Sequence, residues 1–159
     1  MTALACLAAW DVRRGQVMGR CEDTTGIAPF ARLVEQVMTT EPYASADRVF
    51  WIVDNGSSHR GAASAERMAT AWPNAQLIHL PVHASWLDQA EIYFSIVQRK
   101  VVAPNDFTDL DQIRTRLAEF EIRYNAVAGP FNWRFTRTNL NALLDRLAAH
   151  EQARHELAA

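Results

Sequence analysis

The chain has 159 residues, and a chain of about this length buries roughly 68–70% of its unfolded surface, enough for one domain with a real core. Apolar residues make up 49% of it and charged residues 21%, which excludes a disordered chain. Its net charge is −2, so nonspecific nucleic-acid binding through bulk positive charge is excluded as well. We therefore expect a single domain over residues 1–159.

Cysteine usage and hydropathy indicate the compartment. Cys6 and Cys21 could face each other across a hairpin, but two cysteines in a chain without a secretory signal favour reduced thiols. Their spacing is not that of a metal site. No run approaches the roughly 18 apolar residues of a membrane span. We predict a cytoplasmic protein with no membrane partner.

The first part of the chain predicts a β-hairpin followed by a helix. Two apolar segments flank a polar turn at 11–15, which is typical of two antiparallel strands. Apolar residues at helical spacing then predict an amphipathic helix that ends before Pro42. These residues are Phe30, Leu33, Val34, Val37 and Met38.

Strands and helices alternate in the next part. Five consecutive apolar residues, 49–53, are typical of a strand buried on both faces. A short helix at 62–72 and a second apolar strand at 75–81 follow. Strands separated by a helix predict a parallel pair, and the hairpin adds an antiparallel edge. The expected fold is α/β, with one mixed sheet flanked by helices.

The rest of the chain is predicted to be helical. Helices are expected from 85 to 100 and from 108 to 128, the second opening on a capping box of Thr108 and Asp111. A terminal helix carries four leucines, Leu140, Leu143, Leu144 and Leu147.

Asp54 and Glu91 are the candidate catalytic and metal-binding residues. Asp54 follows a predicted strand, at the sheet edge where functional groups gather in α/β folds. Glu91 lies on the helix after the next strand, which can bring it close to Asp54. Converging carboxylates repel unless a cation lies between them, and Mg²⁺ or Mn²⁺ prefers oxygen ligands. When only these two residues are considered, other roles are more common. An Asp before Asn-Gly is more often a turn residue, and a Glu in a helix more often lies at the boundary with solvent.

Three segments carry a resemblance to a known family: WIVDNGSSHRG, LIHLPVHASWLDQAEIYFSIVQRKV and YNAVAGPFNWRFT. They resemble the catalytic domain of Asp-Asp-Glu (DDE) transposases from bacterial insertion sequences, in the mariner-related superfamily. The resemblance extends from the hairpin to residue 140. It implies a ribonuclease H-like fold in which Asp54 is the second catalytic carboxylate and Glu91 the third.

The resemblance also implies a reaction and a partner. It implies DNA transposition, in which two divalent ions, Mg²⁺ or Mn²⁺, assist cleavage and strand transfer at transposon ends. DNA is then the expected partner, contacted by His59, His83, Arg99, Lys100, Arg134 and Arg137. For the two histidines a loop or strand-cap role is an equal alternative. For the four cationic residues, a charge at a helix end and a solvated surface position are close alternatives.

The chain departs from the family pattern at its start. The family's first catalytic Asp lies on the strand before the hairpin, and Met1 falls where that strand should already have ended. We therefore expect a sheet without its first strand and a site without its first carboxylate. Asp11 is interpreted as a turn residue and not as a substitute. The helix-turn-helix segment that precedes the domain in family members is also expected to be absent.

Two hypotheses follow from this departure. In one, the chain is a transposase catalytic domain whose missing part comes from a companion N-terminal polypeptide. In the other, it is a catalytically inactive remnant, at most a module that binds nucleic acid or oligomerises. An unpaired strand edge would favour a homo-oligomer.

Overall fold

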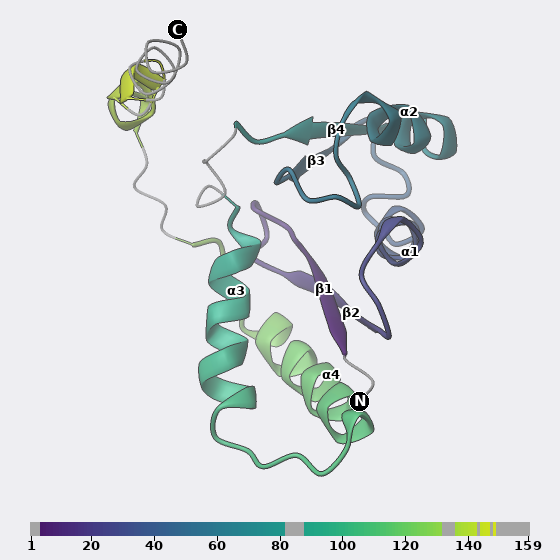
Figure 1. Ribbon diagram of the computed structural model, residues 1–159, viewed down its shortest axis with the longest axis vertical. Coiled ribbons are helices and arrows are strands. Elements are labelled where there is room, and N and C mark those ends of the chain that lie inside the picture. The colour runs from purple at the N-terminus through teal and green to yellow at the C-terminus, as the bar shows by residue number, and fades with distance from the viewer. Residues whose placement is uncertain (1–3, 82–87, 132–135, 143, 147, 149–159) are drawn as a thin grey trace, which may run out of the picture.

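The computed structural model describes residues 4–81, 88–131, 136–142, 144–146 and 148. Strands and helices alternate over most of this length, so the predicted α/β class is confirmed (Figure 1). None of the described helices is long and apolar enough to cross a membrane. The elements are β1 (Ala5–Trp10), β2 (Val17–Glu22), α1 (Ile27–Met38), β3 (Val49–Val53), α2 (Ala62–Ala71), β4 (Ala75–His79), α3 (Ala90–Val97), the π-helical turn η2 (Gln98–Val102) and α4 (Leu110–Ala126).

The strands form two separate sheets. Strands β1 and β2 make the predicted antiparallel hairpin, with Cys6 opposite Cys21. Strands β3 and β4 make the predicted parallel pair, with Trp51 opposite Leu77. The prediction of one mixed sheet differs from the structure, because in the described part of the chain neither β1 nor β3 pairs outside its own sheet.

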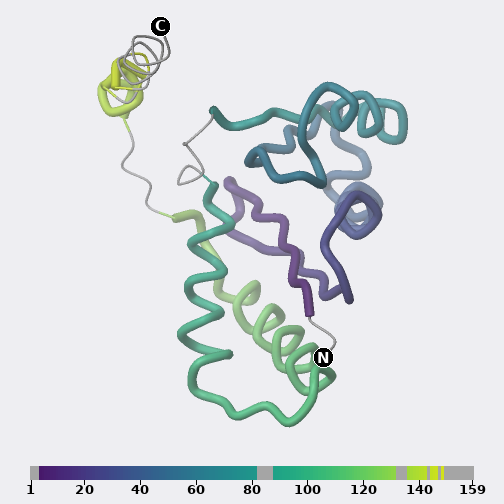
Figure 2. Tube along the Cα trace, viewed as in Figure 1, coloured from purple at the N-terminus to yellow at the C-terminus, as the bar shows by residue number. Residues whose placement is uncertain are grey.

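The two sheets contribute to two different cores, and Ala9 and Met18 of the hairpin also pack against the core of β3 and β4. Helices α1 and α2 lie beside β3 and β4, while α3 and α4 lie against the hairpin (Figures 1 and 2). Helix α1 also contacts both strands of the hairpin. The first core contains Val34, Val37, Met38, Trp51, Val53, Met68, Ala75 and Leu77, and the second contains Val17, Tyr93, Val97 and Val101.

Strand β3 is buried on one face and exposed on the other. Trp51 and Val53 are in the core, whereas Phe50 is 54% exposed and Ile52 is 50% exposed. The prediction of a strand buried on both faces was therefore wrong. The covering helices pack against one face only, so the alternate residues of this apolar run meet solvent.

The outer edge of β2 is covered by side chains. The Asn125 side chain accepts a hydrogen bond from Val17 N at 2.8 Å and donates one to Val17 O at 2.7 Å. Glu121 Oε2 accepts from Gly19 N at 2.9 Å, and Gln36 Nε2 donates to Gly19 O at 3.2 Å. These contacts satisfy main-chain groups that an edge strand would otherwise leave open to another chain.

Candidate active site

Asp54 lies directly after β3, at the carboxyl end of the parallel pair. Leu80 N donates to Val53 O at 2.8 Å, and Asn55 Nδ2 donates to Leu80 O at 2.9 Å, so the ends of β3 and β4 are tied together. The Asp54 side chain is 44% exposed. The structure thus places this carboxylate at the sheet edge expected for a functional group and leaves it open to a ligand.

His59 fixes one oxygen of the Asp54 carboxylate. Asp54 Oδ1 accepts hydrogen bonds from Gly56 N at 2.9 Å and from His59 Nε2 at 2.5 Å. His59 Nδ1 lies 3.0 Å from Ser58 Oγ, so with Nε2 protonated the ring accepts from the serine hydroxyl. The Phe30 ring on α1 packs against the imidazole with centroids 5.0 Å apart. His59 is held on several sides and presents Nε2 to the carboxylate.

Gly56 permits this close arrangement. A Cβ at position 56 would lie 2.9 Å from Asp54 Oδ1 and 3.0 Å from His59 Nε2. Glycine at this position therefore leaves room for the Asp54–His59 contact.

Asp54 stays ionised in this environment. Burial raises the pKa of its carboxyl, but the hydrogen bonds from His59 and Gly56 N outweigh that effect and leave the pKa below its usual range. The group therefore presents a negative charge at neutral pH.

Glu91 and Asp88 lie at the start of α3. Glu91 is in the first turn and exposed, while Asp88 is partly buried and accepts a hydrogen bond from Ala90 N at 3.0 Å. Burial raises the pKa of the Asp88 carboxyl, and the negative charge of Asp54 raises it further. Asp88 is thus a carboxylate within electrostatic reach of Asp54 that sequence reasoning did not single out. Its position just before a helix start was the available signal.

A comparison with known protein families matches residues 2–114 to the family described as DDE superfamily endonuclease. The matched range covers well over half of the chain and includes both candidate carboxylates. The chain belongs to the DDE superfamily endonucleases. No curated protein and no solved structure matches it. The DDE resemblance of its sequence is therefore confirmed.

Endonucleases of this superfamily depend on divalent cations, and the donors present suit such ions chemically. Asp54 and Glu91 supply carboxylate oxygens, the ligands that Mg²⁺ and Mn²⁺ prefer. Within the described ranges, no group of three or more His, Cys, Asp or Glu side chains is close enough together to hold a metal ion.

The candidate DNA contacts of this DDE endonuclease domain are spread along the chain. His59 is engaged with Asp54. Arg99 and Lys100 lie exposed in η2, about 12 Å along the helix axis from Glu91. Arg137 is exposed at the start of a further helical segment over residues 137–142, which stands apart from the sheets in Figure 1. His83 and Arg134 lie outside the described residues.

Proposed function

We propose that this chain is a divalent-metal-dependent DNA endonuclease and strand transferase that acts in DNA transposition. Asp54 and Glu91 are its proposed catalytic carboxylates and the ligands of Mg²⁺ or Mn²⁺. The observation that carries the proposal is the ionised, half-exposed Asp54 at the end of β3, in a chain matched to the DDE endonuclease family. A ribonuclease H-like arrangement of the strands belongs to the same proposal.

The residues around Asp54 have positioning roles in this proposal. When bound, the cations activate water or a 3′-hydroxyl and stabilise the leaving oxygen of the phosphodiester. Asp54 provides a fixed negative charge toward them, and His59 and Gly56 N orient its carboxylate by hydrogen bonds to Oδ1. Glu91, exposed on the first turn of α3, provides another carboxylate.

DNA is the proposed substrate and partner. The exposed side chains of Arg99, Lys100 and Arg137 are the proposed contacts to backbone phosphates, which position DNA without reading its sequence. The DDE pattern requires three carboxylates. Asp54 and Glu91 are proposed as the second and third of these, and a companion polypeptide and a second copy of this chain are proposed partners.

A catalytically inactive module that binds nucleic acid or oligomerises is the second candidate function. It is favoured by one observation, that the described residues hold no group of three metal-ligating side chains.

Mn²⁺ binding separates the two candidates. Calorimetry on the full chain should show binding that is lost in Asp54→Asn and in Glu91→Gln. Glu66→Gln, which changes an exposed carboxylate on α2, should bind as the unchanged chain does. If the wild type binds Mn²⁺ no more strongly than the two site variants, the proposed metal site is wrong. The inactive module would then be the candidate function that remains.

The role of His59 gives a second test. His59→Ala removes the donor to Asp54 Oδ1 and should weaken Mn²⁺ binding about 10- to 100-fold, as loss of a residue that orients a metal ligand does. His59→Gln, which retains an N–H donor, should recover part of the loss. Equal Mn²⁺ binding by the wild type and both variants would show that His59 stabilises only its loop and does not orient the Asp54 carboxylate for the metal.

A further inference from the structure

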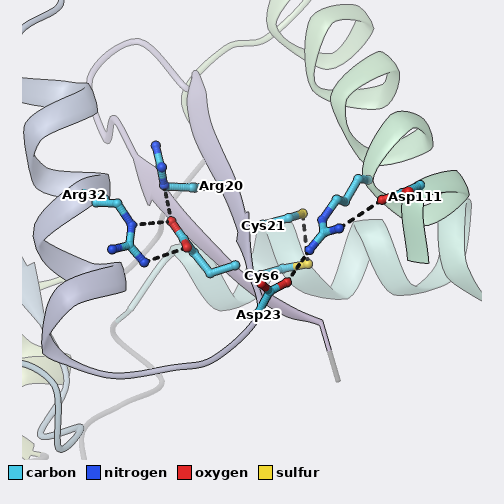
Figure 3. Close-up of polar contacts among 8 residues, drawn as sticks. Cys6, Arg20, Cys21, Asp23, Arg32 and Asp111 are labelled. Atoms are coloured by element: carbon cyan, nitrogen blue, oxygen red, sulfur yellow. Dashed lines mark hydrogen bonds and ion pairs between the residues drawn. The ribbon is translucent and has the colours of Figure 1, made fainter. Parts of the chain in front are cut away.

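The two cysteines of the hairpin form a close pair. Cys6 on β1 and Cys21 on β2 are direct partners in the antiparallel register, and their Sγ atoms lie 3.4 Å apart (Figure 3). Both thiols are free. We propose that this pair is a reversible redox site, which closes to an intramolecular disulfide by exchange with a low-molecular-weight disulfide such as oxidised glutathione. This inference does not depend on the proposed function.

The backbone of the hairpin suits such a bond. Val17 and Gly19 direct their N–H and C=O groups to side chains beyond the edge of β2, and therefore away from β1. Backbone direction alternates along a strand, so Cys21 shares this orientation and its pair with Cys6 is of the non-hydrogen-bonded kind. In such pairs the Cα atoms are about 4.5 Å apart and the side chains closest. That separation lies within the roughly 4.4–6.8 Å range of disulfides.

A small reagent can reach the pair. Cys6 is exposed, and Cys21 is partly exposed. Both line a cavity of about 250 Å³ between the hairpin and helices α3 and α4, whose other walls include Tyr93, Arg114 and Glu121. In Figure 3 the two thiols lie side by side on the hairpin, on the side that faces α4.

The surroundings give the two thiols different reactivity. The hydrogen bond from Cys6 and the positive charge of Arg114 lower the pKa of Cys21 to about 7, against the opposing effects of burial, Glu121 and Glu22. The same hydrogen bond and burial raise the pKa of Cys6. At neutral pH, Cys21 therefore supplies the thiolate, while Cys6 remains a thiol.

Arg114 is held beside the pair by two carboxylates. Its Nη2 donates to Asp23 Oδ1 at 2.6 Å, and its Nη1 donates to Asp111 Oδ1 at 3.0 Å. These contacts hold its guanidinium between the end of the hairpin and the first turn of α4, where its charge acts on Cys21.

The exchange takes two balanced steps. The Cys21 thiolate attacks one sulfur of the reagent, whose S–S bond breaks to release a thiolate and leave a mixed disulfide on Cys21. Cys6 gives its proton to solvent or to the released thiolate and attacks Cys21 Sγ, which expels the second thiolate. The protein loses two electrons, and the reagent is reduced to two thiols. A reducing dithiol reverses the sequence.

Intact mass and peptide mapping test the proposal on the full chain. After reduction and incubation with oxidised glutathione at neutral pH, the mass should fall by two hydrogens with no glutathione retained. Trypsin without reductant should then yield one disulfide-linked species that joins peptides 1–13 and 21–32. A reducing dithiol should restore both thiols. An unchanged mass, or a stable glutathione adduct as the main product, would overturn the proposal.

Variants separate the roles of the residues. Cys6→Ser should accumulate a glutathione adduct on Cys21, because no thiol remains to displace it. Arg114→Gln should slow the exchange, since Cys21 loses its neighbouring charge. Arg116→Gln is the matched control, because Arg116 pairs with Glu119 and should leave the rate unchanged. Equal rates in both arginine variants would exclude a role for Arg114.

Discussion

The strand pair β3–β4 and the hairpin β1–β2 are both packed against helices, but their cores are built from different side chains. Around β3–β4 the buried residues are mainly aliphatic and include a fully buried Met38. Around the hairpin a smaller buried core is surrounded by aromatic rings. Trp10 stacks on Phe131 with centroids 4.3 Å apart, and Tyr93 meets Tyr124 edge to face. Ring contacts therefore contribute more to the second core than to the first, where Phe30 and Trp51 meet edge to face.

The two regions also differ in their polar contacts. The hairpin edge is bonded to α4 through Asn125 and Glu121, side chains that reach main-chain groups. Burial raises the pKa of the Glu121 carboxyl, while its hydrogen bond from Gly19 N opposes the shift. Around β3–β4, side chains tie loops together instead, as Asn74 Nδ2 does to Ala46 O at 2.9 Å.

The difference bears on the candidate site, because the site draws on both regions. Asp54 belongs to the β3–β4 region, and Glu91 stands on α3, which packs against the hairpin. Their relative position depends on the contacts that join the regions. One is the hydrogen bond from the Tyr43 hydroxyl to Asp11 Oδ2 at 2.5 Å. Helix α1 provides a second connection, since it packs against Trp51 and also contacts the hairpin.

Met38→Ala should have the largest effect on stability. Met38 is 2% exposed, and its truncation leaves a cavity in the first core, so we expect a loss of about 2–5 kcal/mol in the free energy of unfolding. Hydrogen exchange should accelerate more in β3 and β4 than in the hairpin. Glu35→Ala, on the exposed face of α1, is the control. Equal acceleration in all four strands would show that the two regions unfold as one unit.

Asn125→Ala should destabilise the hairpin more than the β3–β4 region. Val17 is 1% exposed, and this change leaves its buried N–H and C=O without partners, at a cost of about 1–3 kcal/mol. Exchange should accelerate first in β2. Arg123→Ala, a change on the exposed side of the same helix, should alter stability by less than about 0.5 kcal/mol. Equal losses in the two variants would show that the side-chain bonds to Val17 do not stabilise the hairpin.

Periodicity in the sequence predicted the local elements well, because each depends on nearby residues. The hairpin around Asp11, helix α1 and the parallel pair are where the patterns indicated. Asp11 is a turn residue, as interpreted, since its Oδ1 accepts from Arg13 N and Arg14 N. The predicted start of α4 was off by one position. The N-cap is Asp109 and not Thr108, because the Asp109 side chain accepts the hydrogen bond from Gln112 N.

Features that depend on tertiary packing could not be predicted. An apolar run does not reveal whether helices will cover one face of β3 or both, so the exposure of Phe50 was missed. The candidate site was placed at Asp54 because of the predicted strand end. The hydrogen bond from His59 to Asp54 depends on the fold of a loop, which has no periodic signal in the sequence. Asp88 was missed because its interaction with Asp54 crosses elements far apart in the chain.

Glu22→Gln should have the smallest effect and a distinct pH dependence. Glu22 accepts from Arg32 Nε at 2.9 Å and Nη2 at 2.7 Å, and these contacts join β2 to α1 (Figure 3). Glu22 also accepts from Arg20 on its own strand. These contacts lower the pKa of Glu22 from 4.5 to about 2, and the hydrogen bonds from Arg32 have the largest effect. In the unfolded chain the carboxyl takes up a proton near pH 4.5, whereas in the folded chain it stays ionised down to about pH 2.

The stabilisation by Glu22 is therefore complete above pH 4.5 and is lost as the pH falls toward 2. Thermal unfolding of wild type and Glu22→Gln should differ at neutral pH, with the variant less stable, and the two should converge in acid. Added salt should narrow the gap at neutral pH, because it screens exposed charges. Glu66→Gln, which changes a carboxylate exposed on α2, should follow the wild type throughout. A gap that stays constant down to pH 2 would mean that packing, and not charge, joins β2 to α1 at this point.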